Sequence, residues 1–409
     1  MRKPSDKPNI VLVNCDDLGY GDLACTGHAL HRTPHLDRMA AEGVRFTDFY
    51  QGSPVCSPSR GAMLTGCYPK RIGFDSFDGH GVLFPGHGVG LNPSEVTFAS
   101  LLKGRGYATQ IIGKWHCGDQ PEFLPTRHGF DHYYGIPFSN DMGRQAGREQ
   151  TPPLPLLRDE AVIEEQPDQA GLTARYVEEA VSFMRAHRDE PFLLYFAHMY
   201  VHLPIYVPER FAAESRNGRY GGAVACIDWA MGVLLHTLRA LGLDENTLVL
   251  FTSDNGSRCD FGPSNGPLHG RKATCWDGGQ RLPFLVRWPG QVPAGRVCDE
   301  LVTGMDLLPT FARLAGTESP ADRIVDGRDI APLLRGETGA HSPHKAFYYY
   351  TQGNLAAVRS GNWKLHVGPK GWGREEPRVG ALFDLARDVG ETVDVAADHA
   401  EVVRELQAL

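Results

Sequence analysis

The stretch IVLVNCDD at residues 10–17 joins a continuous apolar run to a pair of carboxylates. A second stretch of the same kind, LVLFTSDNG at residues 248–256, also ends in acidic and amide side chains. Continuous apolar runs of this length are typical of strands that are buried on both faces of a mostly parallel sheet. Ligands bind at the carboxyl ends of such strands, so we expect a binding site where these two stretches end.

Other segments extend this pattern along the chain. Apolar runs at 109–112 and 192–197 predict two more buried strands. Helices are predicted from Thr33-Pro34 to Gly43, from Asn92-Pro93 to Gly104 or Gly106, and along the apolar positions between Ile227 and Leu241. Alternation of strands and helices indicates an α/β fold, with a large mostly parallel sheet sandwiched by helices.

The pattern changes beyond about Pro332, where short runs are flanked by polar residues. They predict a small antiparallel sheet with a closing helix. We therefore divide the chain into a catalytic α/β domain at 1–338 and a small C-terminal α+β subdomain at 339–409. The four predicted strands of the subdomain are 346–350, 355–359, 363–367 and 382–385.

Composition limits the classes of function. The 409 residues are 42% hydrophobic and 22% charged, which excludes a disordered chain and supplies enough apolar surface for a large core. The formal charge of −8 gives no global positive field, which argues against nucleic acid as a partner. It also weakly disfavours long polyanionic substrates, although a local basic patch could override it.

Cysteine usage and hydropathy bear on the compartment. Nine cysteines, an odd number without a CxxC pair, argue against a disulfide framework or a zinc ribbon. The longest apolar run, at 191–201, is roughly half of what a membrane-crossing helix needs. The first residues run directly into a strand and leave no room for a signal peptide. We expect a cytoplasmic protein without a membrane segment, unless an export signal has been removed.

The ends of the two decisive stretches suggest a metal site. Asp16 and Asp17 would repel each other unless a cation lay between them. Asp254 and Asn255 offer two more oxygens of the kind that hard cations prefer, which favours Ca²⁺ and leaves Mg²⁺ possible. The alternative is that both ends are ordinary Asx turns. Two such strand ends in one chain favour the metal.

One segment carries a resemblance to a known family. Cys56-Ser57-Pro58-Ser59-Arg60, followed by Leu64-Thr65-Gly66, resembles the signature of the type I sulfatases of the alkaline phosphatase superfamily. The resemblance implies an alkaline phosphatase-like fold and conversion of Cys56 by a maturation enzyme to formylglycine (3-oxoalanine). The hydrated residue would be the nucleophile and a fifth metal ligand, and Arg60 would position and polarise it. The alternative is an unmodified cysteine at the start of a helix.

Further motifs in register with this signature imply the rest of the site. GKWH, GIPFSND, VHLP and GRK resemble sulfatase segments, the second of them that of the arylsulfatase A and N-acetylgalactosamine-6-sulfatase branch. The resemblance implies that Lys114 binds an oxyanion and His116 acts as a base. It also places Ser139 against the substrate, with His202 and Lys272 gripping the sulfate and assisting the leaving group.

The chemistry of these residue types agrees with the resemblance. Hydrolysis of a sulfate ester builds negative charge on the leaving oxygen, and Arg60, Lys114, Lys272 and a metal would stabilise that charge. We therefore expect hydrolysis of sulfate monoesters of an aryl or carbohydrate alcohol. The alternatives are a phosphonate monoester or phosphodiester hydrolase of the same superfamily, and a non-catalytic sulfate-binding homologue. The glycine- and histidine-rich segment at 79–88 is predicted to be a mobile loop near the mouth of the site.

Overall fold

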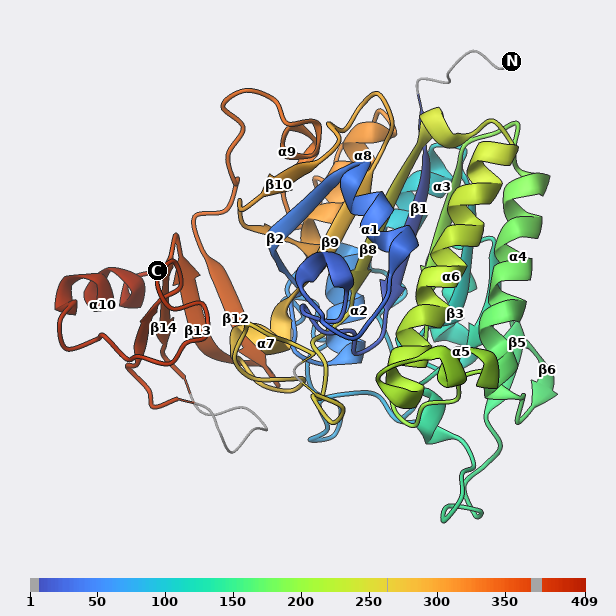
Figure 1. Cartoon of the computed structure of the whole chain (residues 1–409), viewed down its shortest axis with the longest axis horizontal. Coiled ribbons are helices and arrows are strands. Elements are labelled where there is room, and N and C mark those ends of the chain that lie inside the picture. The colour runs from blue at the N-terminus through green and yellow to red at the C-terminus, as the bar shows by residue number, and fades with distance from the viewer. Residues whose placement is uncertain (1–6, 263, 369–376) are drawn as a thin grey trace.

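The computed structural model describes residues 7–262, 264–368 and 377–409 (Figure 1). Within these ranges the largest feature is an eleven-stranded sheet in the order β10-β2-β9-β8-β1-β7-β3-β4-β5-β6, with β11 also paired to β2. Its strands are β1 (Asn9–Cys15), β2 (Val44–Tyr50), β3 (Ala108–Lys114), β4 (His132–Ile136), β5 (Pro155–Arg158), β6 (Ala161–Glu165), β7 (Phe192–Ala197), β8 (Thr247–Ser253), β9 (Arg281–Arg287), β10 (Arg296–Cys298) and β11 (Val302–Thr303).

The centre of the large sheet is parallel. β1 pairs in parallel with β8 on one side and with β7 on the other, and β7 pairs in parallel with β3. Antiparallel pairs occur where β9 joins β2 and β8, and where β5 joins β4 and β6. The register places Cys15 beside Ser253, so the polar residues after β1 and β8 meet at one edge. The predicted mostly parallel sheet is confirmed.

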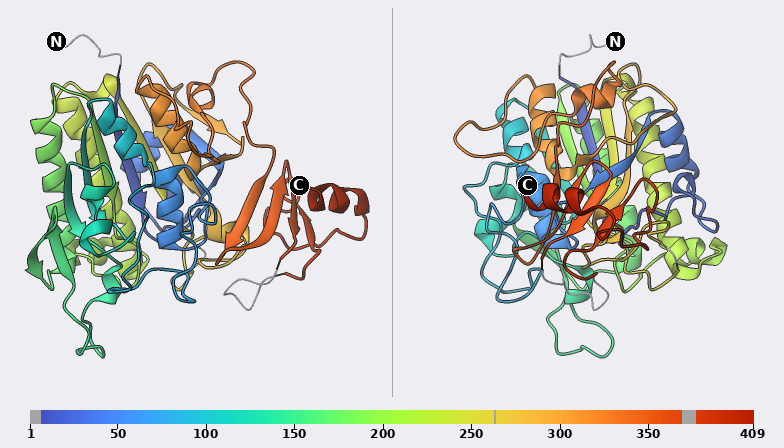
Figure 2. Two further views of the ribbon diagram at one scale, coloured as in Figure 1. Left: turned by 180° about the vertical axis from the view of Figure 1, so that it is seen from behind. Right: turned by 90° about the vertical axis from the view of Figure 1, so that its left-hand side faces the viewer.

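Helices cover both faces of the large sheet (Figures 1 and 2). Alternate residues of β1 face opposite cores: Val11 and Val13 belong to one apolar cluster, and Ile10 and Leu12 to the other. The first face is covered by α1 (Pro34–Ala41), α4 (Leu172–Ala186) and α6 (Gly218–Ala240), with α5 (Glu209–Glu214) against α6. The second is covered by α2 (Cys56–Thr65), α3 (Phe98–Gly104), α8 (Leu307–Leu314) and α9 (Ala331–Arg335).

The helix α6 is the main core helix of its layer. Among the described residues it alone is long and apolar enough to cross a membrane by length and composition, but 72% of that apolar window is buried inside the protein. Its apolar face, predicted between Ile227 and Leu241, packs with α4 against the sheet. Burial within the fold accounts for the hydropathy of this helix.

A smaller antiparallel sheet lies at one end of the molecule, as Figure 2 shows. The predicted division at 338/339 falls in the irregular segment between α9 and this sheet, and it stays a prediction. The small sheet contains β12 (Phe347–Thr351), β13 (Asn354–Ser360), β14 (Trp363–His366) and β15 (Leu382–Asp384), and α10 (Ala400–Gln407) packs against it.

A buried ion cluster joins the two sheets. Asp277 begins the short helix α7 (Asp277–Gln280), which leads into β9 of the large sheet. Lys364 of β14 places Nζ 2.9 Å from Asp277 Oδ1 and 2.9 Å from Glu391 Oε2, and all three side chains are fully buried. Tyr349 of β12 donates its hydroxyl to the same Asp277 oxygen at 2.8 Å. Tyr50 of β2 and Arg281 of β9 contact the other oxygen of Asp277, so both sheets stabilise its charge.

One predicted helix begins later than expected. The helix predicted from Asn92-Pro93 is α3, which starts at Phe98 with Thr97 as its N-cap. Thr97 Oγ1 accepts the backbone N–H of Ser100 at 3.1 Å, and Ser100 Oγ accepts the N–H of Thr97 at 3.0 Å. Asn92 instead forms a turn, because its side chain accepts the N–H of Ser94. The reciprocal capping box outweighs the Asn-Pro signal.

Candidate active site

The ends of β1 and β8 place four polar side chains in one buried cluster. Asp254 donates its backbone N–H to the Cys15 carbonyl at 3.0 Å, and Asp17 donates its own to Asp254 Oδ1 at 3.3 Å. Asp16, Asp17, Asp254 and Asn255 are each at most 2% exposed. The two strand ends are adjacent, as the sequence analysis expects. Three carboxylates in a buried site require compensating positive charge.

Two oxygens in this cluster lack a hydrogen-bond partner among the described residues. They are Asp17 Oδ2 and Asn255 Oδ1, while Asn255 Nδ2 donates to Asp17 Oδ1 at 2.7 Å. A buried oxygen without a partner is costly, and carboxylate and amide oxygens are the ligands of hard cations. Asp17 also has a left-handed backbone with φ of 62°. The cluster therefore fits a divalent metal ion.

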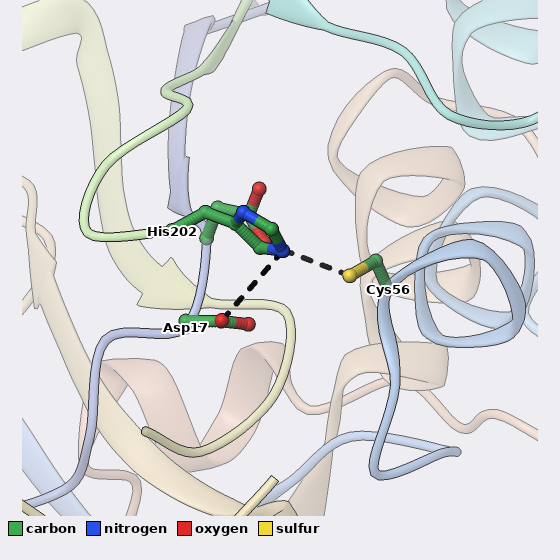
Figure 3. A group of neighbouring side chains, drawn as sticks. Asp17, Cys56 and His202 are labelled. Atoms are coloured by element: carbon green, nitrogen blue, oxygen red, sulfur yellow. Dashed lines mark hydrogen bonds and ion pairs between the residues drawn. The ribbon is translucent and has the colours of Figure 1, made fainter. Parts of the chain in front are cut away.

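Cys56 begins α2 and faces this cluster. Its Sγ lies 3.7 Å from Asp16 Oδ1, and Lys272 Nζ lies 3.3 Å from the same sulfur. Figure 3 shows Asp17, Cys56 and His202 converging from separate segments. Potential ligand atoms of Asp16, Asp17, Cys56 and His202 all lie within 4.8 Å of one another. Burial raises the pKa of the Cys56 thiol to about 12, so the unmodified side chain is protonated at neutral pH.

Asp254 interacts chiefly with Arg60. Arg60 Nη2 lies 2.8 Å and Nε 2.9 Å from Asp254 Oδ2, and both side chains are at most 1% exposed. Arg60 Nη1 also donates to the backbone carbonyl of Lys114 at 2.7 Å. Burial, and then the neighbouring Asp16, raise the pKa of Asp254 to about 6. Arg60 thus holds the ends of β8 and β3 together, and the assignment of Asp254 and Asn255 as ligands stays a prediction.

Two lysines neutralise the adjacent aspartates. Lys114 Nζ lies 2.6 Å from Asp16 Oδ2, and Lys272 Nζ lies 2.6 Å from Asp17 Oδ1. Burial opposes ionisation of Asp16, but the Lys114 ammonium lowers the pKa of that carboxyl strongly. Burial likewise disfavours the charged form of Lys272, yet Asp17 raises the pKa of this lysine well above its usual value. Both lysines are therefore cations beside Cys56.

Ser139 and His202 complete this wall of the site. Lys114 Nζ donates to Ser139 Oγ at 3.2 Å, and Ser139 Oγ lies 3.4 Å from the ring nitrogens of His202. His202 Nδ1 donates to the Leu203 carbonyl at 2.6 Å, which leaves Nε2 on the side of Asp17 at 3.9 Å from Oδ2. Burial, followed by the charge of Lys272, lowers the pKa of His202. The imidazole is therefore neutral in this state.

His116 is buried beside Lys114 and is neutral. Its Nε2 donates to the Leu83 carbonyl at 2.9 Å, and its buried Nδ1 has no hydrogen-bond partner within the described ranges. Burial, and then the charge of Lys114, lower the pKa of His116 well below the usual value. Its backbone is left-handed, with φ of 59°, a costly conformation that occurs often at functional sites. The lone pair on Nδ1 is free to accept a proton.

Five of the predicted site residues border a cavity of about 470 Å³, namely Cys56, His116, Ser139, His202 and Lys272. The structure thus brings together every residue that the sequence analysis places at the site. Sequence reasoning missed three charged residues of the lining, namely Asp141, Arg258 and Arg271. Arg271 directly precedes Lys272, and Asp141 ends the GIPFSND segment, so their positions offered a signal. The full lining is Val55, Cys56, Val82, Phe84, His116, Ser139, Asp141, Met142, His202, Arg258, Arg271, Lys272, Ala273 and Thr274.

The chain matches two models of known protein families. The family model described as Sulfatase matches residues 8–317. The chain belongs to the sulfatase family. A second model, described as N-sulphoglucosamine sulphohydrolase, C-terminal, matches residues 271–408 of this sulfatase. The two matches together span almost the whole chain.

Individual relatives give the same result for this sulfatase. Steryl-sulfatase of Rattus norvegicus is 39% identical over 517 residues, covering 99% of this chain and 89% of the relative. Arylsulfatase A of Homo sapiens is 40% identical over 444 residues, covering 98% and 86% respectively. The crystal structure of Ps i-CgsB in complex with k-i-k-neocarrahexaose has a TM-score of 0.86 and 30% identity, covering 98% of this chain and 91% of that one.

These findings confirm the expected family, fold and class of reaction. The protein is an enzyme that hydrolyses sulfate esters, built on the alkaline phosphatase-type fold. The expectation of a sulfate ester as substrate is also confirmed at that level.

Proposed function

We propose that this sulfatase hydrolyses the sulfate monoester of a sulfated carbohydrate through a converted Cys56, with Ca²⁺ at the ends of β1 and β8. The observation that carries the proposal is the position of Cys56. Lys272 Nζ contacts both Cys56 Sγ, at 3.3 Å, and Asp17 Oδ1, at 2.6 Å. The position of the nucleophile therefore lies beside a buried lysine that also contacts a proposed metal ligand.

The proposed metal ligands are Asp16, Asp17, the converted Cys56, Asp254 and Asn255. The unpartnered oxygens of Asp17 and Asn255 support this assignment. Oxygen ligands that include an amide favour Ca²⁺ over Mg²⁺. When bound, the metal supplies positive charge that polarises the sulfate group and stabilises the transition state.

The unmodified Cys56 thiol is poorly suited to act as the nucleophile itself. With a pKa of about 12 in its buried position, the thiol is a poor nucleophile at neutral pH. The converted residue supplies, in its hydrated form, a hydroxyl nucleophile together with a second hydroxyl for regeneration. A formylglycine-generating maturation enzyme is the partner that this proposal requires.

The chain's own residues then have distinct tasks. Lys114 and Lys272 bind sulfate oxygens, because both ammonium groups border the position of Cys56. His116 accepts a proton at Nδ1, since Nε2 is held by the Leu83 carbonyl. His202 exchanges a proton with the leaving oxygen through Nε2, since Nδ1 is held by the Leu203 carbonyl. Arg60 positions Asp254 and the end of β3.

The test combines mass spectrometry with kinetics on protein from the native host. We expect the tryptic peptide with Cys56 to lose sulfur and gain an aldehyde, and the purified enzyme to cleave 4-nitrophenyl sulfate. Cys56→Ala should abolish turnover, while Cys298→Ala, a buried cysteine of β10, should retain it. An unmodified thiol in fully active enzyme, or faster cleavage of an aryl phosphodiester than of the sulfate, would refute the proposal.

We also propose that the enzyme works in a reducing compartment. Eight cysteines form no disulfide within the described residues, namely Cys15, Cys25, Cys56, Cys67, Cys117, Cys226, Cys259 and Cys298. Cell fractionation with thiol labelling of the native protein tests this, and recovery from an oxidising compartment would contradict it.

A further inference from the structure

A second cavity adjoins the catalytic one. It has a volume of about 830 Å³ and shares Asp141 and Arg258 with the lining of the catalytic cavity. The remaining walls come from segments far apart in the sequence, around 145–148, 203–205 and 216–219, together with Phe261. A substrate whose sulfate lies beside Cys56 can therefore extend into this second space.

The second cavity is strongly basic. Four arginines line it, Arg148, Arg216, Arg219 and Arg258, against the single carboxylate of Asp141. Of these arginines only Arg258 has an ion pair in the described part of the chain, with Asp260 at 3.0 Å. The others are exposed and carry uncompensated charge in a protein whose formal charge is −8. Clustered unpaired arginines attract anionic groups.

An aromatic ring and apolar side chains form another part of the cavity. Phe261 is 45% exposed, and its ring stacks on Tyr220 at a centroid distance of 5.4 Å and an interplanar angle of 22°. The stacking fixes one face of the Phe261 ring and leaves surface for a ligand. Leu203, Pro204 and Ile205 add apolar surface to the same cavity. Such a surface suits the body of a ring-shaped ligand, whereas the arginines suit its anionic substituent.

Hydrogen bonds tie this cavity to the catalytic residues. Asn140, next to Ser139, donates Nδ2 to the Pro204 carbonyl at 3.2 Å. Gln145 Nε2 donates to the Asn140 carbonyl at 3.1 Å. His202 Nδ1 lies 3.1 Å from Asn140 Oδ1. These hydrogen bonds therefore fix the wall of the second cavity relative to the residues that border the position of the sulfate.

We propose that Arg148, Arg216, Arg219 and Arg258 form an arginine subsite for a second anionic group on the substrate. The substrate class is a sulfated oligosaccharide in which the ring next to the scissile sulfate carries a sulfate or carboxylate. This inference rests on the proposed function and deepens it. The local basic patch overrides the negative charge of the whole chain.

The experiment compares two disaccharides that differ in one group. One carries a sulfate on each ring, and the other carries only the scissile sulfate. We expect the wild-type enzyme to prefer the first, by at least about tenfold in kcat/KM, chiefly through KM. The double variant Arg216→Ala/Arg219→Ala should bring the ratio of the two kcat/KM values close to one. The control Arg185→Ala/Arg188→Ala, which removes two exposed arginines near the end of α4, should keep the ratio.

A binding measurement separates this inference from the proposed function. Calorimetry on Cys56→Ala protein gives the Kd of both disaccharides without turnover. Tighter binding of the doubly sulfated disaccharide, lost in Arg216→Ala/Arg219→Ala, supports the subsite even if hydrolysis fails. Equal Kd values for the two disaccharides, or an unchanged ratio in that variant, would overturn the subsite. Absence of sulfate release by converted wild-type enzyme from 4-nitrophenyl sulfate and from both disaccharides would instead overturn the proposed function.

Discussion

Lys114 Nζ lies 2.6 Å from Asp16 Oδ2, and neither side chain has any exposed surface. A buried pair of this kind gives little net stability when complete, but removal of one partner leaves an uncompensated charge. The same lysine donates to Ser139 beside the substrate position. We therefore expect Lys114 to affect both the stability of the metal-free protein and the turnover of the sulfate ester.

Lys114→Met tests both aspects of this pair. In the metal-free protein we expect the free energy of unfolding to fall by about 3–5 kcal/mol, because Asp16 stays buried without its cation. Added Ca²⁺ should restore much of this loss, since the metal replaces the missing charge. We expect kcat to fall by roughly 10²–10³ as one fixed donor to the sulfate is lost. Urea unfolding with and without Ca²⁺, and kinetics on 4-nitrophenyl sulfate, provide the measurements.

Lys103→Met is the matched control for that variant. Lys103 pairs with Asp131 at 2.7 Å, but its side chain is 48% exposed. Its loss should change the unfolding free energy by less than about 1 kcal/mol. Equal destabilisation by the two substitutions, or no response of Lys114→Met to Ca²⁺, would contradict the account given for Lys114.

Asp22 should make stability depend on pH in a defined direction. Burial raises its pKa to about 7, although Tyr220 donates a hydrogen bond to it at 2.7 Å. The folded state thus binds more protons than the unfolded state between about pH 4 and 7. The contribution of Asp22 to stability is greatest below that range and is lost as the pH rises through it, by at most about 1.4 kcal/mol per pH unit.

Asp22→Asn removes this contribution. The unfolding free energy of the wild type minus that of the variant should fall from pH 4 to 7 and stay level above pH 7.5. Urea unfolding at several pH values measures the difference. Asp189→Asn, at a side chain that is 85% exposed, should leave the wild-type slope unchanged. A difference that rises with pH would show that the pKa of Asp22 is lowered, not raised.

The N-cap of α3 predicts a local effect on stability. Thr97→Ala removes the acceptor for the Ser100 N–H and also the donor to the His128 carbonyl at 2.6 Å. We expect the unfolding free energy to fall by about 1–2 kcal/mol. Ser94→Ala, in the exposed turn where the sequence predicts the helix to begin, should cost less than about 0.5 kcal/mol. Urea unfolding separates the two, and a larger effect at Ser94 would favour the earlier start.

The ion cluster between the sheets predicts a larger effect. Lys364→Met removes the buried cation that Asp277 and Glu391 share and leaves Asp277 with only the longer ion pair to Arg281, at 3.4 Å, among the described residues, so we expect a loss of about 3–5 kcal/mol in unfolding free energy. Lys345→Met, at an exposed lysine before β12, is the control and should be near neutral. Ca²⁺ affinity should also decrease in Lys364→Met, because Gly256 after Asn255 donates its N–H to the Gly279 carbonyl of α7 at 3.0 Å. Unchanged stability would mean that the cluster contributes nothing.

The central strands could be predicted because each is a continuous run of apolar residues, as strands buried on both faces require. β7 has its predicted limits, 192–197, since all six residues are apolar or small and buried. The start of α3 was not predictable from Asn92-Pro93, because the reciprocal bonds of Thr97 and Ser100 compete with that signal. At the site, the motif around Cys56 and the resemblance it carries placed Lys114, Ser139, His202 and Lys272 together.

The contacts that could not be predicted join residues that are far apart in the sequence. Arg148, Arg216, Arg219 and Arg258 belong to no common motif, and only the packing of separate loops and the start of α6 brings them to one cavity. The partner of Asp277 is equally remote, since Lys364 follows it by 87 residues. Contacts of this kind leave no local pattern in the sequence from which they could be predicted.

The placement of Asp277 affects how sulfatases can exchange parts. The irregular segment around 336–346 is the obvious place to join halves of two relatives, yet such a chimera would combine Asp277 from one parent with Lys364 and Glu391 from the other. The C-terminal family match begins at residue 271, ahead of α7, and overlaps the larger match. Recombination that keeps residues 271–408 together preserves the electrostatic match between the sheets. The segment to exchange as one unit is therefore longer than the small C-terminal sheet and its helix, and it includes Arg271 and Lys272 of the active site.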